Sequence, residues 1–85
     1  MRFVPVESSN VAAVAYDGAD VLLVKFRGGA GAGDVYRYRG VDPATYDALL
    51  AAESKGSFIA RRVARNPAYQ CDKMPAADVA GLVEE

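Results

Sequence analysis

Hydrophobic and polar positions alternate along two segments in the first half of the chain, and this pattern predicts β-strands over residues 21–27 and 35–39. Successive side chains of a strand point to opposite faces, so alternate positions share one face. The apolar face of this pair consists of Leu22, Val24, Phe26, Tyr36 and Tyr38. The intervening segment 28–34 contains four glycines in seven residues, which indicates a flexible hairpin loop between two antiparallel strands.

Two further strands are expected before this hairpin. Residues 1–6 are apolar and alternating, and Pro5, which has no N–H to donate, restricts that strand to a sheet edge or an entry segment. Residues 10–16 are rich in β-branched and small side chains, and the turn residues at 17–20 end that segment.

The helical signals begin in the middle of the chain. Asp42-Pro43 joins a good N-cap to a residue suited to the first helical position, and Lys55-Gly56 is a typical helix end. On this first helix Tyr46, Leu49 and Leu50 are expected to share one apolar face. A second helix is expected over 57–65, with Phe58, Ile59 and Val63 turned inward and its arginines outward. A short helical turn is also expected at 78–83.

Together these elements predict an α+β fold in one domain, 1–85: a three- to four-stranded antiparallel meander followed by two helices packed on one sheet face. The opposite sheet face would then carry Lys25, Arg27, Arg37 and Arg39. Like charges on neighbouring strands repel one another, so four cations on one face must be spread apart or matched to an anion.

The charge of the chain is unevenly distributed. The net charge is −1, yet eight of the ten Lys and Arg residues lie between 25 and 65, against four acids. The chain is therefore basic in its middle and acidic towards its ends.

Composition excludes several kinds of chemistry. The chain has no histidine, which argues against histidine acid–base catalysis and most zinc sites, and its single cysteine, Cys71, has no partner for a disulfide. The loop 28–34 joins two predicted strands and lacks the Lys-Ser/Thr pair of a phosphate loop. Ser8 and Ser9 are expected to bond neighbouring backbone. We expect no enzyme activity, no catalytic residue, no metal and no cofactor. With no membrane span and no signal peptide recognisable, we expect a cytoplasmic protein.

Read together, the segments resemble the KTSC domain, a small bacterial domain named for the lysyl-tRNA synthetase C-terminus. The resemblance covers about residues 6–69, and 70–85 form an extension beyond it. The matching segments are 6–11, 14–17, Tyr36-Arg37-Tyr38, 40–43 with Tyr46 and Leu50, and Ser54-Lys55-Gly56-Ser57-Phe58. The glycine loop is longer than the short turn usual in that family. The family occurs as a synthetase appendage and in stand-alone bacterial or phage proteins, and the resemblance implies RNA as a ligand.

Two sets of residues are candidates for that role. The candidate phosphate-binding cations are Arg37, Arg39, Lys55, Arg61, Arg62 and Arg65. Among them Lys55 lies where the second helix begins and can hold an anion together with free helix amides. Tyr36 and Tyr38 offer a stacking surface for bases, but they share the parity of the core positions, which favours a place beneath the helices.

Two functions remain open. The first is a nucleic-acid-binding domain for a tRNA-like RNA that uses the basic sheet face and the second helix. The second is a protein-interaction module or small homo-oligomer that uses an exposed edge strand or Val21 and Leu23 on the outer face. The sequence pI of 5.3 favours the second, because dedicated nucleic-acid binders are usually basic.

Overall fold

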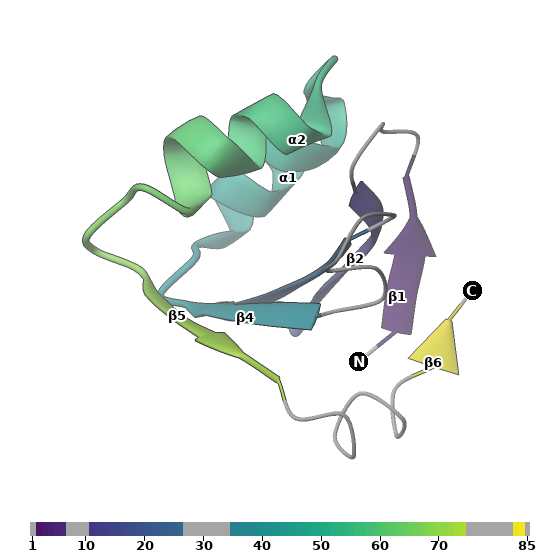
Figure 1. Ribbon diagram of the computed structural model, residues 1–85, viewed down its shortest axis with the longest axis horizontal. Helices are drawn as coiled ribbons and strands as arrows, with labels where there is room; N and C mark the ends of the chain where they lie inside the picture. Colours follow the sequence, from purple (N-terminus) through teal and green to yellow (C-terminus); the bar gives the residue numbers. More distant parts are fainter. Residues whose placement is uncertain (1, 7–10, 27–34, 75–82, 85) are drawn as a thin grey trace.

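The computed structural model describes residues 2–6, 11–26, 35–74 and 83–84, and shows one sheet with its helices gathered on one face (Figure 1). The strands are β1 (Arg2–Pro5), β2 (Val11–Tyr16), β3 (Val21–Phe26), β4 (Val35–Arg39), β5 (Gln70–Lys73) and β6 (Val83–Glu84). The helical elements are α1 (Pro43–Ala51), α2 (Lys55–Phe58) and the π-helical turn η1 (Ile59–Val63). The strand order across the sheet is β5-β4-β3-β2-β1-β6.

The central meander confirms the sequence prediction. Strands β1 to β4 are antiparallel neighbours in chain order, with bounds within a residue or two of those expected. Between β2 and β3, one carboxylate oxygen of Asp17 accepts backbone N–H bonds from Ala19, Asp20 and Val21 at 2.8–3.0 Å. These bonds hold the pKa of Asp17 below its ordinary value. Gly18 lies in this turn with a positive φ of 86°.

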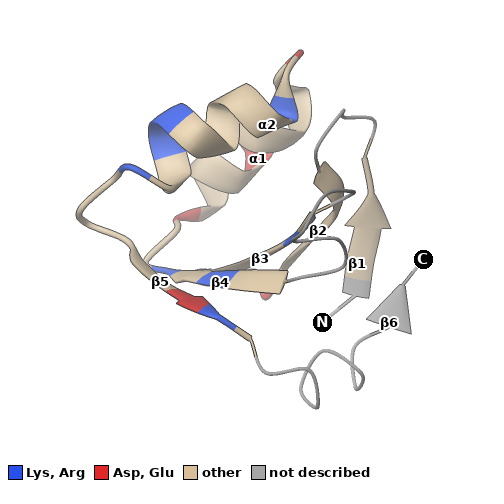
Figure 2. Ribbon diagram, in the orientation of Figure 1, with Lys and Arg blue, Asp and Glu red and all other residues tan. Residues whose placement is uncertain are grey.

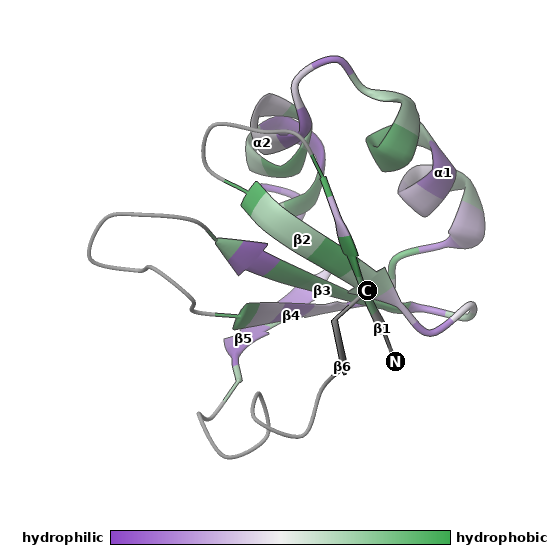
Figure 3. Cartoon of the chain, turned by 90° about the vertical axis from the view of Figure 1, so that its right-hand side faces the viewer, coloured by the Kyte–Doolittle hydropathy of each residue, from purple (hydrophilic) through white to green (hydrophobic). Residues whose placement is uncertain are grey.

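The main hydrophobic core lies between the meander and the helices. The register places Val24 opposite Tyr36 and Leu22 opposite Tyr38, so the predicted apolar face is confirmed and faces α1 and η1. The buried members of this core are Val6, Val11, Val14, Leu22, Val24, Tyr38, Val41, Leu49, Ile59 and Val63. In Figure 3 the hydrophobic positions, in green, lie on the strands of the meander and on the helices.

Helix α1 begins as predicted and ends earlier than predicted. The Asp42 side chain accepts a hydrogen bond from the Thr45 N–H at 3.0 Å, and Pro43 occupies the first turn. Its expected apolar face is partly wrong: Leu49 is buried, but Leu50 is 39% exposed. Adjacent helical positions point about 100° apart, so the face that buries Leu49 turns Leu50 outward.

The expected helix end at Lys55-Gly56 is also wrong. Helix α1 ends at Ala51, and Gly56 lies inside α2, where its φ is not positive. The physical reason is that Ser54 caps α2, accepting the Ser57 N–H at 3.3 Å, so the second helix starts two residues sooner. It continues into η1, where Ile59 and Val63 are buried as expected.

Two strands of the sheet were not expected. β5 pairs antiparallel with β4, and β6 pairs parallel with β1 through Arg2↔Val83 and Phe3↔Glu84. The expectation of a helical turn at 78–83 is wrong at Val83, and its other residues lie outside the described part of the chain. β1 is consequently an inner strand, and Pro5 is tolerated because the β6 pairing involves Arg2 and Phe3 and not Pro5.

The sheet face opposite the helices is not an open basic face. It carries a second buried cluster from the strands themselves, made of Phe3, Ala13, Ala15, Leu23 and Val35, with Val21 and Met74 packed against it. Leu23 is only 1% exposed, so it is not available as the outer contact surface suggested by the sequence. Lys25 lies over the Phe3 ring, with its Nζ 5.9 Å from the ring centroid. No helix in the described part of the chain is long and apolar enough to cross a membrane.

Candidate nucleic-acid interface

The structure divides the six candidate cations between opposite faces of the sheet. Arg37 and Arg39 have the parity of Leu23 and Val21, their partners on β3, and so point away from the helices. The other four belong to the helical side: Lys55 on α2, Arg61 and Arg62 on η1, and Arg65 in the turn just after η1. The six cations predicted from the sequence therefore do not form one surface.

On the sheet side, Arg37 already has an anionic partner. Its guanidinium donates two hydrogen bonds to the carboxylate of Asp72 on β5, one of them from Nε at 3.1 Å. This bidentate pair holds the pKa of Asp72 below its ordinary value. Arg39, at the end of β4, is exposed and lies opposite Gln70. Arg37 thus links β4 to β5 through its side chain. Arg27, which was expected on the same face, lies outside the described residues.

Lys55 has a local structural role. Its Nζ donates a 3.0 Å hydrogen bond to the carbonyl oxygen of Ala52, just past the end of α1, and the side chain is half-buried. A cation at this place satisfies a carbonyl that the helix leaves without a partner. Lys55 therefore lies near the end of α1, as the sequence predicts, and its ammonium group binds a backbone carbonyl oxygen there.

Arg61, Arg62 and Arg65 are exposed. Figure 2 shows the Lys and Arg positions of this part of the chain in blue along the ribbon. Between Glu53 and Asp72 the sequence contains no acid, and residues 54–71 carry four cations. The side chains of Arg61 and Arg62 line a hollow of about 230 Å³ that also includes Ser54 and Ser57. Exposed positive charge therefore gathers on this part of the chain without a neighbouring acid in the sequence.

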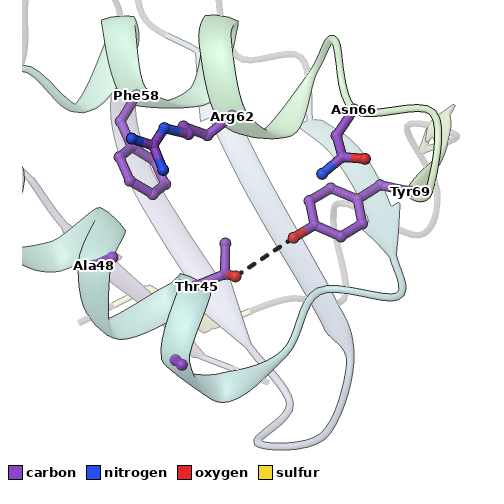
Figure 4. Close-up of a pocket in the computed structure, with 7 residues that line it drawn as sticks. Thr45, Ala48, Phe58, Arg62, Asn66 and Tyr69 are labelled. Atoms are coloured by element: carbon purple, nitrogen blue, oxygen red, sulfur yellow. Dashed lines mark hydrogen bonds between the residues drawn. The ribbon is translucent and has the colours of Figure 1, made fainter.

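A second hollow, called here the helix groove, lies between α1 and the α2–η1 segment (Figure 4). Its volume is about 350 Å³, and its lining residues are Ala44, Thr45, Ala48, Phe58, Arg62, Asn66 and Tyr69. At one end the hydroxyls of Thr45 and Tyr69 lie 3.4 Å apart. Phe58 on α2 and Arg62 on η1 line both hollows, so the two hollows adjoin each other.

The two tyrosines proposed for stacking lie on the core side of β4. Tyr38 is 4% exposed, and burial, with Cys71 as a cross-strand neighbour, raises its pKa above the ordinary value. Tyr36 is half-buried and meets Phe26 edge to face, with ring centroids 5.5 Å apart. Base stacking on a sheet requires aromatic rings on an open sheet face, and neither of these rings lies on one.

Several side chains of the helix groove were not singled out from the sequence. Thr45, Asn66 and Tyr69 come from α1 and from the connection to β5, and no local motif links them. In the sequence, Asn66-Pro67 indicates only the end of a helix. In the structure Asn66 Oδ1 accepts the Ala68 N–H at 2.9 Å, and the amide nitrogen is turned towards the groove (Figure 4).

The remaining chemical candidates add no second site. Ser8, Ser9 and the glycine loop lie outside the described residues. Within the described ranges, no three carboxylate or thiol side chains gather where they could hold a metal ion. Cys71 is exposed on β5 with a free thiol.

This architecture defines a small α+β domain, in which an antiparallel meander carries two helices on one face. The chain belongs to the KTSC domain family, which matches residues 7–69. It is 48% identical over 56 residues to a protein of Tsukamurella paurometabola, an alignment that spans 65% of this chain and 78% of the relative. It is also similar to the crystal structure of a KTSC domain protein from Yersinia pestis, with a TM-score of 0.73, 28% identity, and coverage of 86% of this chain and 96% of that one.

Proposed function

We propose that this chain is a small non-catalytic domain that binds RNA through its phosphates, on the side formed by α2 and η1. The observation that carries the proposal is the uninterrupted positive charge of residues 54–71, with Arg61 and Arg62 directed to a surface hollow. The net charge of −1 does not oppose this, because phosphate binding depends on the local field of a surface patch. Arginine also suits the task, since its planar fork donates two parallel hydrogen bonds to a phosphate.

The interface is narrower than the sequence suggested. Arg37 is paired with Asp72, and Arg37 and Arg39 lie across the sheet from the arginines of η1. One RNA surface that contacts the helices would not reach them without wrapping around a sheet edge. The proposed contact residues are therefore Arg61, Arg62 and Arg65, with Lys55 as a structural neighbour.

The test is an amide-resolved NMR titration with mixed tRNA, first at low salt and then at physiological salt. We expect shifts that cluster on residues 55–65 and fade as salt rises, because bound phosphates release counterions. Replacing Arg61, Arg62 or Arg65 singly by Gln should lower the slope of log K against log salt by about one each. Arg39→Gln, an exposed cation on the other face, is the matched control and should leave the slope unchanged. A spectrum that does not move at low salt would remove RNA from consideration.

A protein-interaction or self-association function is favoured by a different observation. β5 is at the end of the described sheet order, so one side of this strand has no strand partner among the described residues. Leu50 adds an exposed apolar side chain on α1. The discriminating measurement is the size-exclusion mass at two salt concentrations. A dimer that is insensitive to salt would support self-association, and a monomer at both concentrations would contradict it.

A further inference from the structure

The helix groove has the dimensions of a site for one small ligand. Its volume of about 350 Å³ lies at the lower end of the range for ligand pockets, which begins at about 300 Å³. Small side chains at Ala44 and Ala48 form the α1 wall, and they leave the opposite wall accessible. A groove of this size admits one planar ring with its substituents.

Two aromatic rings line the groove, Phe58 from α2 towards one end and Tyr69 at the other (Figure 4). Phe58 and Tyr69 are both half-buried, so each ring is anchored in the protein and also contributes to the groove surface (Figure 4). Anchored aromatic side chains bind unstacked bases because every base has a π-face. The groove therefore offers apolar contact to a flat heterocycle.

The polar groups of the groove are donors suited to an anionic ligand with a polar ring. Arg62 is exposed beside Phe58 and carries the guanidinium, and the Asn66 amide nitrogen points inward (Figure 4). The hydroxyls of Thr45 and Tyr69 at the far end can donate or accept at a base edge. The set of lining residues contains no carboxylate that would repel a phosphate.

The adjoining hollow adds further cationic and hydroxyl groups beside the groove. It shares Phe58 and Arg62 with the groove and adds Arg61 and the Ser57 hydroxyl. Its volume of about 230 Å³ accommodates a phosphate and part of a sugar. An aromatic compartment thus lies next to a compartment lined by two arginines, which is the order of base and phosphate in a nucleotide.

We infer that the helix groove binds one unpaired nucleotide of a single-stranded RNA segment, with its base against Phe58 and Tyr69 and its phosphate at Arg62 and Arg61. The inference rests on the proposed function and specifies it further. The base must be unpaired, since a base inside a duplex is stacked on both sides and cannot enter a groove. The protein is therefore expected to bind single-stranded RNA more tightly than an RNA duplex.

The test compares binding of a short single-stranded oligoribonucleotide and of an RNA duplex, by NMR titration at one salt concentration. Ala48→Leu fills the groove from the α1 wall at an exposed helical position and removes no charge. Ala51→Leu, also exposed on α1 but not part of either hollow, is the matched control. We expect Ala48→Leu to weaken the single strand about tenfold and leave the duplex unchanged, as loss of one stacked base predicts. Ala51→Leu should match the wild type with both ligands.

The other outcomes separate this inference from the proposed function. If wild-type protein binds RNA and Ala48→Leu binds the single strand equally well, the groove inference is wrong and the phosphate-binding proposal stands. If wild-type protein binds neither RNA at low salt, both fail. A phosphotyrosine peptide that binds at least as tightly as the single strand, and whose binding Ala48→Leu weakens, would identify the groove as a protein-docking site and overturn the nucleotide assignment.

Discussion

Arg37 on β4 and Asp72 on β5 are directly opposite one another in the antiparallel ladder, and their side chains form a bidentate ion pair. Asp72 lies beyond residues 7–69, the part of the chain that matches the KTSC family. The pair therefore connects the family's meander to a strand outside the matched region. Both partners are partly exposed, with side-chain exposures of 27% and 44%.

This pair predicts a specific dependence of stability on pH. Because Arg37 lowers the pKa of Asp72 in the folded state, the contribution is fully present above the ordinary value of 3.8 and is lost as pH falls through the lowered folded value. Asp72→Asn removes it. Thermal unfolding midpoints should therefore differ most at neutral pH and converge in acid. The pKa values of Asp17 and Asp42 are also lowered, but both residues are present in the wild type and in Asp72→Asn, so their effect on stability cancels in the comparison. A gap between the two midpoints that persists unchanged into strong acid would contradict the prediction.

Leu49 and Leu50 offer a matched pair of substitutions on α1. Leu49 is 1% exposed and packs in the main core, whereas Leu50 is 39% exposed. Leu49→Ala should lower the free energy of unfolding by about 2–5 kcal/mol, because it removes buried methyl groups and leaves a cavity. Leu50→Ala should change it by less than about 0.5 kcal/mol, as expected at the surface. Urea unfolding of the two variants measures both, and equal losses would show that the assigned helix face is wrong.

Gly18 tests the backbone of the β2–β3 turn. Its φ is 86°, and a Cβ built there meets nothing within 4 Å, so any cost of substitution comes from the backbone conformation. Gly18→Ala should destabilise the protein by about 1–2 kcal/mol. Gly18→Asn should cost less, because asparagine tolerates the left-handed region better. Chemical denaturation of both variants provides the comparison, and an Asn variant as unstable as the Ala variant would contradict it.

Tyr16 joins the β2–β3 turn to the entry of α1. Its ring stacks on Tyr46 with a centroid distance of 4.6 Å. Its hydroxyl proton is shared between the carbonyl oxygens of Val41 at 2.6 Å and Ala19 at 2.8 Å. Tyr16→Phe keeps the stacked rings and removes the hydrogen bond, so it should cost about 1 kcal/mol of unfolding free energy. Tyr16→Leu also removes the stacking and should cost more. The order of the two values in urea denaturation is the decisive readout.

The meander was predictable because its chemistry is local. Leu22, Val24, Tyr36 and Tyr38 alternate with period two, and this pattern alone determines which side chains meet the helices. Strand β5 has no such pattern, since Gln70–Lys73 is polar and only Asp72 among its residues is half-buried. Its strand conformation depends on pairing with β4, which a local pattern does not encode. The same holds for the two residues of β6.

The candidate site shows the same division. Exposed arginines on η1 could be predicted from helical spacing once Ile59 and Val63 were placed in the core. Their separation from Arg37 and Arg39 follows from strand parity, yet a combined surface was expected because the sequence shows only proximity along the chain. The helix groove depends on tertiary packing that brings Thr45 within 3.4 Å of Tyr69, 24 residues later.

The parallel pairing of β6 with β1 places the two ends of the described chain on neighbouring strands, with β6 at the sheet edge and β1 beside it (Figure 1). Arg2 is the register partner of Val83, so neighbouring-strand spacing, about 5 Å, separates the backbones near the two ends. A linker of a few residues would join them, and new ends could be opened in an exposed turn such as 17–20. The domain is therefore well suited to circular permutation and to insertion into a loop of a host protein, where both junctions would lie at one point on the surface.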